Sequence, residues 1–281
     1  MLIELAVGDA YGAGFEYAPE SPERPNDLSR YVKHPRHAIV PGCYTDDTQM
    51  SIAIAELIVS GAEWTPINIA SQFVTAFKRD PRSGYATGFH GFLQKVSDGK
   101  QFLEQIRPDS DKSGAAMRAG PIGVFPSVDE VISRATIQAR LTHNTPDGTA
   151  AAVASALMAH YFMYQLGPVS SLGEFLDTHV PGERRWSRPY QGKVKSKGWM
   201  SVQAAVTAIT CNTTLSGLLK TCVEFNGDVD TVAAIALGAA SCSPDHEPDL
   251  PTHLIEMLEN GSYGYAYITA LDARLLACIN R

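Results

Sequence analysis

The chain has 281 residues, of which 44% are hydrophobic and 19% charged, and it carries a formal net charge of −7 with a pI of about 5.6. This length is enough to bury a sizeable core, and the composition is that of an ordinary globular protein. The negative charge argues against nucleic acid and anionic membranes as partners, whereas a modified protein, a nucleotide derivative or a metal ion is compatible with it.

Helical periodicity dominates the chain. In residues 46–60, for example, Met50, Ile54 and Leu57 recur at the spacing of one helix face. Few segments alternate with a period of two, so we predict an all-α fold without a core sheet. The predicted helices span residues 46–60, 65–79, 127–141, 147–166, 200–211, 213–224, 229–241 and 263–279.

Two of these helices begin with recognisable capping sequences. Thr65 precedes Pro66, which places a capping side chain before a proline at the first helical position. Ser127 and Glu130 have the spacing of a capping box. These signals predict that the second and third helices start at these points of the chain.

Two stretches interrupted by proline and glycine are predicted to be loops. The first, residues 17–44, has no clear period. The second, residues 180–199, is polar and basic, and we expect either a solvated, mobile surface loop or a contact surface for a partner. Since no internal repeat or shift in composition marks a boundary, we predict a single domain over residues 1–281, with a polar loop insertion near residues 180–199.

The cysteines and the first residues predict a cytoplasmic protein. Five cysteines occur without a CxxC pair or regular spacing, which favours a reducing compartment over a disulfide scaffold. Residues 1–11 contain Glu4 and Asp9 but no basic region like that of a signal peptide. No apolar run reaches the ~18 residues of a membrane span.

Two acidic clusters stand at the starts of two predicted helices. One contains Asp46 and Asp47, and the other contains Asp228 and Asp230. Carboxylates favour helix starts in general, so helix capping is the structural alternative for either cluster alone. However, the helix after the second cluster has almost no polar surface and is predicted to be buried, where unpaired carboxylates are costly. A divalent cation would compensate them, magnesium first and manganese or calcium second.

Two glycine-containing segments could bring backbone close to other groups. In residues 8–16, Gly8 and Gly12 are four positions apart and could let two helices touch. Residues 113–121 are rich in small residues, and their backbone amides could face a phosphate or a ribose. Tight helix packing is the alternative explanation for either segment.

Taken in chain order, five segments resemble the ADP-ribosylglycohydrolase family. They are GDAYGAGFE (8–16), YTDDTQM (44–50), SGAAMRAGPIG (113–123), LTHNTPDG (141–148) and GDVDTVAAIALGAA (227–240). The resemblance implies an all-helical fold with two Mg²⁺ ions in a cleft, Mn²⁺ being a possible substitute. It also implies hydrolysis of the N- or O-glycosidic bond that links ADP-ribose to a protein side chain or a small molecule.

The resemblance also implies roles for individual residues. The implied metal ligands are Thr45, Asp46, Asp47, Asp228, Asp230 and Thr231. The candidates that would activate or position the attacking water are Asp46, Asp47 and Glu16, the last of which matches a family glutamate that can cover the cleft. The implied substrate-binding residues are Ser113, Gly114, Ala115, Met117, Arg118, His143, Asp80 and Tyr85.

The sequence departs from the family pattern at two places. Ser113-Gly114 stands where the family often has Asn-Gly, and Asn226-Gly227 precedes Asp228 where many members have Gly-Gly. Both changes should leave the metal ligands intact. His143 has a structural alternative as a hydrogen-bonded core histidine, and Asp80 has one in a turn that Pro81 begins.

Two other functions compete with hydrolysis. A protein of the same fold could bind ADP-ribose or a toxin without turnover, as an immunity factor. An isoprenoid synthase-like enzyme also holds magnesium on helical aspartates, but its motif has a further acid after a two-residue gap, which is missing after Asp46-Asp47. The leaving group and the target stay open, and we expect a monomer.

Overall fold

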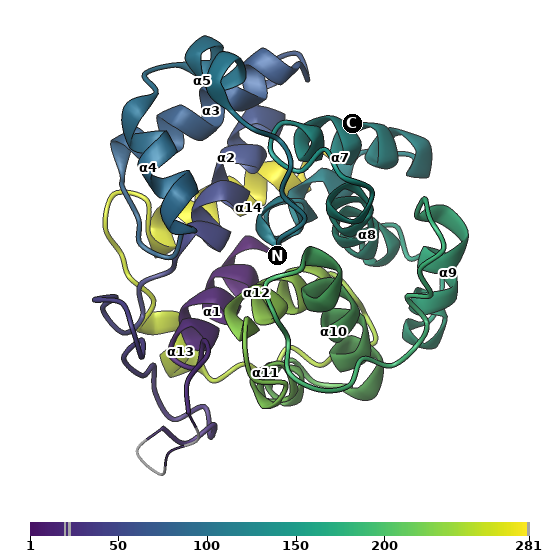
Figure 1. The fold of residues 1–281 in the computed structure, drawn as a ribbon. Coiled ribbons are helices and arrows are strands. Elements are labelled where there is room, and N and C mark those ends of the chain that lie inside the picture. Colours follow the sequence, from purple (N-terminus) through teal and green to yellow (C-terminus); the bar gives the residue numbers. More distant parts are fainter. Residues whose placement is uncertain (20, 22–23, 280–281) are drawn as a thin grey trace.

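The computed structural model describes residues 1–19, 21 and 24–279, and α-helices form nearly all of its regular structure (Figure 1). The helices are α1 (Leu2–Ala13), α2 (Asp46–Ser60), α3 (Pro66–Arg79), α4 (Thr87–Lys95), α5 (Gly99–Gln105), α6 (Gly114–Met117), α7 (Val128–Arg140), α8 (Pro146–Met163), α9 (Leu172–His179), α10 (Gly198–Cys211), α11 (Leu215–Glu224), α12 (Val229–Ala240), α13 (Thr252–Glu256) and α14 (Tyr265–Leu276). Short 3₁₀ turns span Gly120–Val124 and Val169–Ser171. Only isolated β-bridges occur among the described residues, so the all-α prediction is confirmed.

Helix α12 lies at the centre of the fold, and every one of its residues is buried. Helix α1 packs along it, and α2, α8, α10 and α11 also contact it. Two glycines of α1 allow the close approach that the sequence predicted. A Cβ atom on Gly8 would lie 2.6 Å from the carbonyl oxygen of Ala233, and one on Gly12 would lie 2.5 Å from the Cα atom of Asp230.

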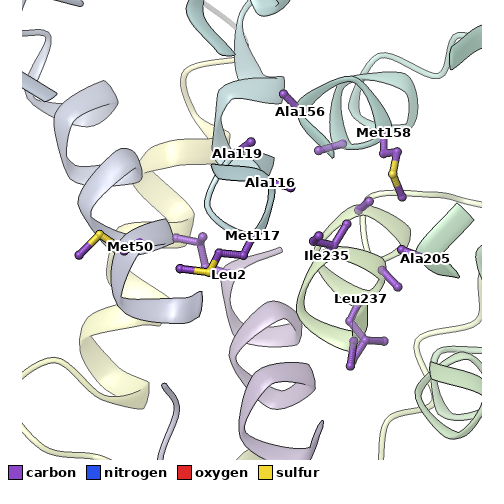
Figure 2. Packing of buried hydrophobic residues seen from close by; sticks show 14 of the residues in the cluster. Leu2, Met50, Ala116, Met117, Ala119, Ala156, Met158, Ala205, Ile235 and Leu237 are labelled. Carbon is purple, nitrogen blue, oxygen red and sulfur yellow. The ribbon is translucent and has the colours of Figure 1, made fainter. Parts of the chain in front are cut away.

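Small and aliphatic side chains fill the space around this central pair. Figure 2 shows side chains from α1, α2, α6, α8, α10 and α12 in one cluster, among them Leu2, Met50, Met117 and Ile235. Because α12 consists mostly of alanine and other small residues, neighbouring helices can approach it from all sides. The start of α12, which carries two aspartates, is therefore held in a fixed position.

The predicted caps form. The Thr65 side chain accepts a hydrogen bond from the backbone amide of Asn68, and Ser127 accepts one from that of Glu130, so α3 and α7 each begin one residue later. Helix α2 has the predicted bounds. Six helices lie outside the predicted ones, namely α1, α4, α5, α6, α9 and α13.

The first predicted loop is free of helix where the structure describes it, and its residues 20, 22 and 23 lie outside the described residues. The second, predicted over residues 180–199, is free of helix except for its last two residues, which belong to α10. The second runs from Val180 to Lys197, and α10 begins directly after it. It is anchored to the core, since the side chains of Trp186 and Val194 are buried. Among the helices that the structure describes, none has the length and apolar character needed to cross a membrane.

Candidate active site

Carboxylates from three helices meet at one point in the fold. Asp9 lies on α1, Asp47 on the first turn of α2 and Asp230 on the first turn of α12, and oxygen atoms of the three lie within 4.8 Å of one another. A second group consists of Glu16, Asp228 and Asp230, with the same spacing. Both groups contain Asp230, so the two groups adjoin each other.

Apart from Glu16, these carboxylates lack a compensating positive charge within the described structure. Asp9, Asp46, Asp47, Asp228 and Asp230 form no ion pair with any described residue. The Oδ1 atom of Asp47 is buried and has no hydrogen-bond partner. Such a set of oxygen ligands fits a hard divalent cation, which would satisfy the orphaned oxygen and offset the mutual repulsion.

The pKa values of these acids reflect their surroundings. Burial, followed by the negative charge of Asp9, raises the pKa values of Asp46 and Asp47 well above the ordinary value. Burial and the nearby charge of Glu16 raise the pKa of Asp230 in the same direction and that of Asp228 to about 6. Each shift has the sign expected for carboxylates that are desolvated beside like charges.

Capping does not explain the two acidic clusters. Neither Thr45 nor Asp228, the residues that precede α2 and α12, caps its own helix with a side-chain hydrogen bond. Asp9 performs this task for α2 from outside the helix. It accepts hydrogen bonds from the backbone amides of Thr45 and Thr48 at 2.9 and 3.0 Å, and from their hydroxyls at 2.7 and 2.6 Å.

Asp9 belongs to the carboxylate cluster but is absent from the predicted site residues, as are the cleft residues Phe89, Phe92, Arg107 and Lys112. Burial raises the pKa of Asp9, although the four hydrogen bonds from Thr45 and Thr48 oppose that shift. Its position directly after Gly8, in a segment already noted for close helix contact, was the available signal. Asp9 therefore connects the helix contact of α1 with the orientation of the α2 carboxylates.

Glu16 stands at the edge of the cluster and is held by two basic residues. Its carboxylate lies 2.7 Å from Nε2 of His34 and 3.1 Å from a guanidinium nitrogen of Arg36. Burial favours the neutral form of Glu16, but the hydrogen bond of His34 and the charge of Arg36 outweigh it and lower the pKa. Glu16 thus stays ionised beside Asp228 and Asp230.

A cleft of about 600 Å³ opens above the carboxylates. Its floor is acidic, and its walls are partly apolar and partly small and polar. The acidic or hydroxyl floor residues are Glu16, Asp46, Asp47, Asp228, Asp230 and Thr231. The apolar wall contains Phe89, Phe92, Ile106 and Met117. The polar wall includes Ser110, Lys112, Ser113, Gly114, Thr142, His143 and Ser196.

The structure brings most, but not all, of the predicted substrate residues to this cleft. Ser113, Gly114, Met117, Arg118 and His143 line it. Three others do not, namely Ala115, Asp80 and Tyr85. Ala115 is fully buried. Asp80 accepts hydrogen bonds from the guanidinium of Arg82 at 2.9 and 2.6 Å, and Tyr85 donates to Oε1 of Gln49 at 2.6 Å.

Arg118 reaches the cleft wall from the core. Its guanidinium donates to Oε1 of Gln138 and to the hydroxyl of Thr142, both at 2.8 Å, and its Cζ lies 4.4 Å from the centre of the Phe73 ring. No acid pairs with it among the described residues, and burial lowers its pKa to about 9. Arg118 therefore remains charged at neutral pH.

His143 is neutral in this setting. Its Nδ1 atom lies 2.7 Å from the hydroxyl of Thr142, and its ring edge packs against Gly114. Burial lowers its pKa to about 3, and the positive charges of Arg118 and Lys112 act in the same direction. His143 can therefore exchange hydrogen bonds with a ligand, but it does not supply a positive charge at neutral pH.

Gly84 lets the chain after α3 approach the acidic floor. Its φ angle is +113°, a left-handed conformation that favours glycine. A Cβ atom at this position would lie 2.2 Å from Oδ1 of Asp46 and 2.8 Å from the Cβ of Thr45. Gly84 thus forms the part of the wall that covers the first carboxylate cluster.

Comparisons with known proteins show which sequences and folds the chain is similar to. A bacterial relative, the ADP-ribosyl-(dinitrogen reductase) glycohydrolase of Rhodospirillum rubrum, is 26% identical over 266 residues, which cover 91% of this chain and 87% of that protein. The ADP-ribosylarginine hydrolase Tri1 of Serratia proteamaculans is 22% identical over 83% of this chain and 67% of that protein. A solved structure described as an ADP-ribosylglycohydrolase-related protein complex shares the fold, with a TM-score of 0.76 at 20% identity over 99% of this chain and 95% of that one.

Animal relatives match a smaller part. The ADP-ribosylhydrolase ARH3 of Homo sapiens is 29% identical over 187 residues, 58% of this chain and 51% of the human protein. The chain thus spans about half the length of the ARH3 proteins that it matches first. The model of the ADP-ribosylglycohydrolase family matches residues 1–280. The chain therefore belongs to the ADP-ribosylglycohydrolase family.

Proposed function

We propose that this protein hydrolyses the glycosidic bond between ADP-ribose and a modified protein side chain or small molecule, in a reaction that depends on Mg²⁺. The observation that carries the proposal is the group of buried, uncompensated carboxylates on the floor of a cleft of about 600 Å³. This volume lies within the usual range for small-molecule sites, about 300 to 1,000 Å³. The matches to named ADP-ribosyl hydrolases support the same reaction.

The residues that would hold the ions are those at the starts of α2 and α12. They offer only oxygen atoms and are Thr45, Asp46, Asp47, Asp228, Asp230 and Thr231. Thr45 lies beneath the cleft, where its hydroxyl contacts Asp9, so its contribution depends on that contact. An all-oxygen set favours Mg²⁺, with Mn²⁺ as a substitute. When bound, such ions supply positive charge that orients the ribose hydroxyls.

The side chains of the floor suit the charge that develops in this reaction. Breaking the glycosidic bond builds positive charge on the ribose ring, which preorganised carboxylates stabilise. Glu16 is held ionised by His34 and Arg36, and it faces the same space as Asp46 and Asp47. One of these three carboxylates would accept a proton from the attacking water or position it.

The walls suit the rest of an ADP-ribose molecule. Phe89 and Phe92 stand nearly parallel, with an angle of 19° between their rings, and both line the cleft. Flat apolar surfaces of this kind accept a nucleobase. Arg107 and Lys112 line the cleft as well and would complement the negative diphosphate.

A substrate panel tests the proposal. The purified protein is incubated with Mg²⁺ and with arginine-linked, serine-linked or O-acetyl ADP-ribose, and free ADP-ribose is measured. We expect release from at least one substrate, and we expect EDTA or Asp230→Asn to reduce it by about a thousandfold or more, as for loss of a major electrostatic catalyst. The exposed Asp129→Asn substitution on α7 is the matched control and should leave the rate unchanged.

The panel also separates the enzyme from a non-catalytic binder. Tight binding of ADP-ribose by wild-type protein without release from any substrate would contradict hydrolysis and favour the binding or immunity role. Full activity of a folded Asp230→Asn protein would contradict the assignment of the metal ligands.

A further inference from the structure

Residues 192–197, here called the rim segment, form backbone hydrogen bonds both to the stretch that carries Asp228 and to the stretch that carries Ser113. The Val194 amide donates to the carbonyl of Asn226 at 3.0 Å, and the Asp228 amide donates to the carbonyl of Val194 at 3.2 Å. On its other side, the carbonyl of Ser196 accepts from the amide of Ser113 at 3.1 Å. Ser196 also lines the cleft. The rim segment is therefore a fixed part of the cleft mouth, although it belongs to a loop.

The lysines of the rim segment point away from the core. Side chains alternate in an extended chain, and Val194 is fully buried, so Lys193 and Lys195 face solvent. The ammonium group of Lys193 lies 5.4 Å from the centre of the Tyr17 ring, and Tyr17 lines the cleft. Lys197, by contrast, is paired with Asp111.

Lys193 and Lys195 are free to meet a partner. Both are exposed, and neither forms an ion pair with a residue that the structure describes. Neither lines the cleft, whereas Arg107 and Lys112 do, so a small ligand in the cleft would leave the two rim lysines uncovered. Glu224 lines a surface hollow together with Lys193, and Asp109 lies on the cleft wall. Together with Arg107 and Lys112 of the cleft, the two rim lysines outnumber these two acids.

The net charge of the whole chain indicates which kind of anionic partner can bind to the rim lysines. A net charge of −7 repels a long polyanion or an anionic membrane, whereas a short acidic stretch can contact the rim segment alone. We infer that Lys193 and Lys195 dock an acidic stretch of the protein that carries the substrate ADP-ribose, close to the modified residue. This inference rests on the proposed hydrolase function, because it assigns a partner to the same cleft.

The test compares two peptides that carry ADP-ribose through the linkage that the substrate panel identifies. One peptide has aspartates and glutamates beside the modified residue, and the other has neutral residues. We expect the K193E/K195E double variant to lower kcat/KM for the acidic peptide about tenfold at low salt, because complementary surface charge raises association rates by such factors. Hydrolysis of the neutral peptide and of a small ADP-ribose conjugate should change less than twofold.

A matched control carries the same charge change elsewhere. The K100E/K220E variant alters exposed lysines on α5 and α11, neither of which lines the cleft. Its kcat/KM for the acidic peptide should stay near that of wild type. The inference would be overturned if K193E/K195E lost activity equally on all substrates, or if wild type had equal kcat/KM for both peptides. It would also be overturned if single-stranded DNA or anionic vesicles, added as competitors, inhibited hydrolysis of the acidic ADP-ribosylated peptide more strongly than the unmodified acidic peptide does.

A second readout does not need turnover. Fluorescence anisotropy at low salt measures binding of the labelled, unmodified acidic peptide to wild type and to both variants. We expect weaker binding only in K193E/K195E, and unchanged binding would count against the docking surface. If no substrate is hydrolysed but this binding difference is present, the hydrolase proposal fails while the docking surface stands.

Discussion

His143 shows how one buried side chain can set a pH limit on stability. Its pKa is about 3 in the folded protein and 6.5 in its ordinary state, because burial and two nearby cations disfavour the charged form. Between pH 6.5 and pH 3, the unfolded chain therefore binds a proton at His143 that the folded protein does not bind. The stability that comes from a neutral His143 is fully present above pH 6.5 and is lost as the pH falls toward 3, by about 1.4 kcal/mol per pH unit.

Replacing His143 should reduce the loss of folding stability at low pH. We expect the free energy of unfolding of His143→Gln to fall less than that of wild type between pH 6.5 and pH 4, in urea titrations at several pH values. His37→Gln is the control, since His37 is exposed, and it should follow the wild-type curve. Parallel pH curves for wild type and His143→Gln would show that His143 is not held neutral.

The sequence predicts which acidic residues are present near the site better than it predicts where their side chains point. Asp47 and Asp228 were expected from two similar clusters, and the structure brings them together. Asp9 was missed, because its local signal, a position directly after Gly8, is equally well explained by helix packing. Asp80 was expected at the cleft, but it pairs with Arg82, two residues later, and stays outside it. Such local pairing depends on loop geometry, which residue type alone does not specify.

The contact between α1 and α12 leaves no room for a side chain at Gly12. A Cβ atom on Gly12 would meet backbone atoms of Asp230 and Val229 at 2.5 to 2.9 Å, and backbone cannot rotate away as a flexible side chain can. We expect Gly12→Ala to destabilise the protein by about 2 kcal/mol or more. It should also weaken Mg²⁺ binding, because the clash lies at the first turn of α12. Urea unfolding and calorimetric titration with Mg²⁺ measure both effects.

Gly91→Ala provides the comparison. Gly91 lies within α4, and a Cβ atom there would meet no other atom within 4 Å. Since alanine is the better helix former, this variant should be more stable than wild type by up to about 1 kcal/mol. If Gly12→Ala behaved in the same way, the close helix contact would not exist in solution.

Helix positions were predictable in long segments that show helical spacing of apolar residues, abundant helix formers or capping residues. The bounds of α2, residues 46–60, are those predicted, and α3 and α7 are marked by their caps. Helix α1 escaped prediction because two poor helix formers, Gly8 and Gly12, interrupt its run of leucine and alanine. Helices α4, α5, α9 and α13 are short, with few turns in which a period can appear.

Mg²⁺ binding should raise the stability of the whole molecule against unfolding. The clustered carboxylates of Asp9, Asp47 and Asp230 come from α1, α2 and α12, so unfolding separates them and abolishes the site. At a free concentration one hundred times the dissociation constant, Mg²⁺ should stabilise the protein by about 2.7 kcal/mol, or several degrees in Tm. EDTA should reverse the shift in a thermal unfolding experiment.

The Asp230→Asn variant should not be stabilised by Mg²⁺. Its Tm should not respond to Mg²⁺, because Asp230 belongs to both carboxylate groups. Without metal, it should unfold at the wild-type temperature or above, since it no longer buries an acid among like charges. A normal Mg²⁺ shift in this variant would show that the ions bind elsewhere.

The burial of α12 on every side has a consequence for substrate choice. A helix enclosed by α1, α2, α8, α10 and α11 cannot move or accept larger residues without opening the core, so the aspartates at its start are fixed in place. The rim segment and the loop that contains Gly84 reach the same cleft from outside the core. New leaving groups or targets would therefore be accommodated by exchange of rim residues, while the chemistry of the floor is inherited unchanged.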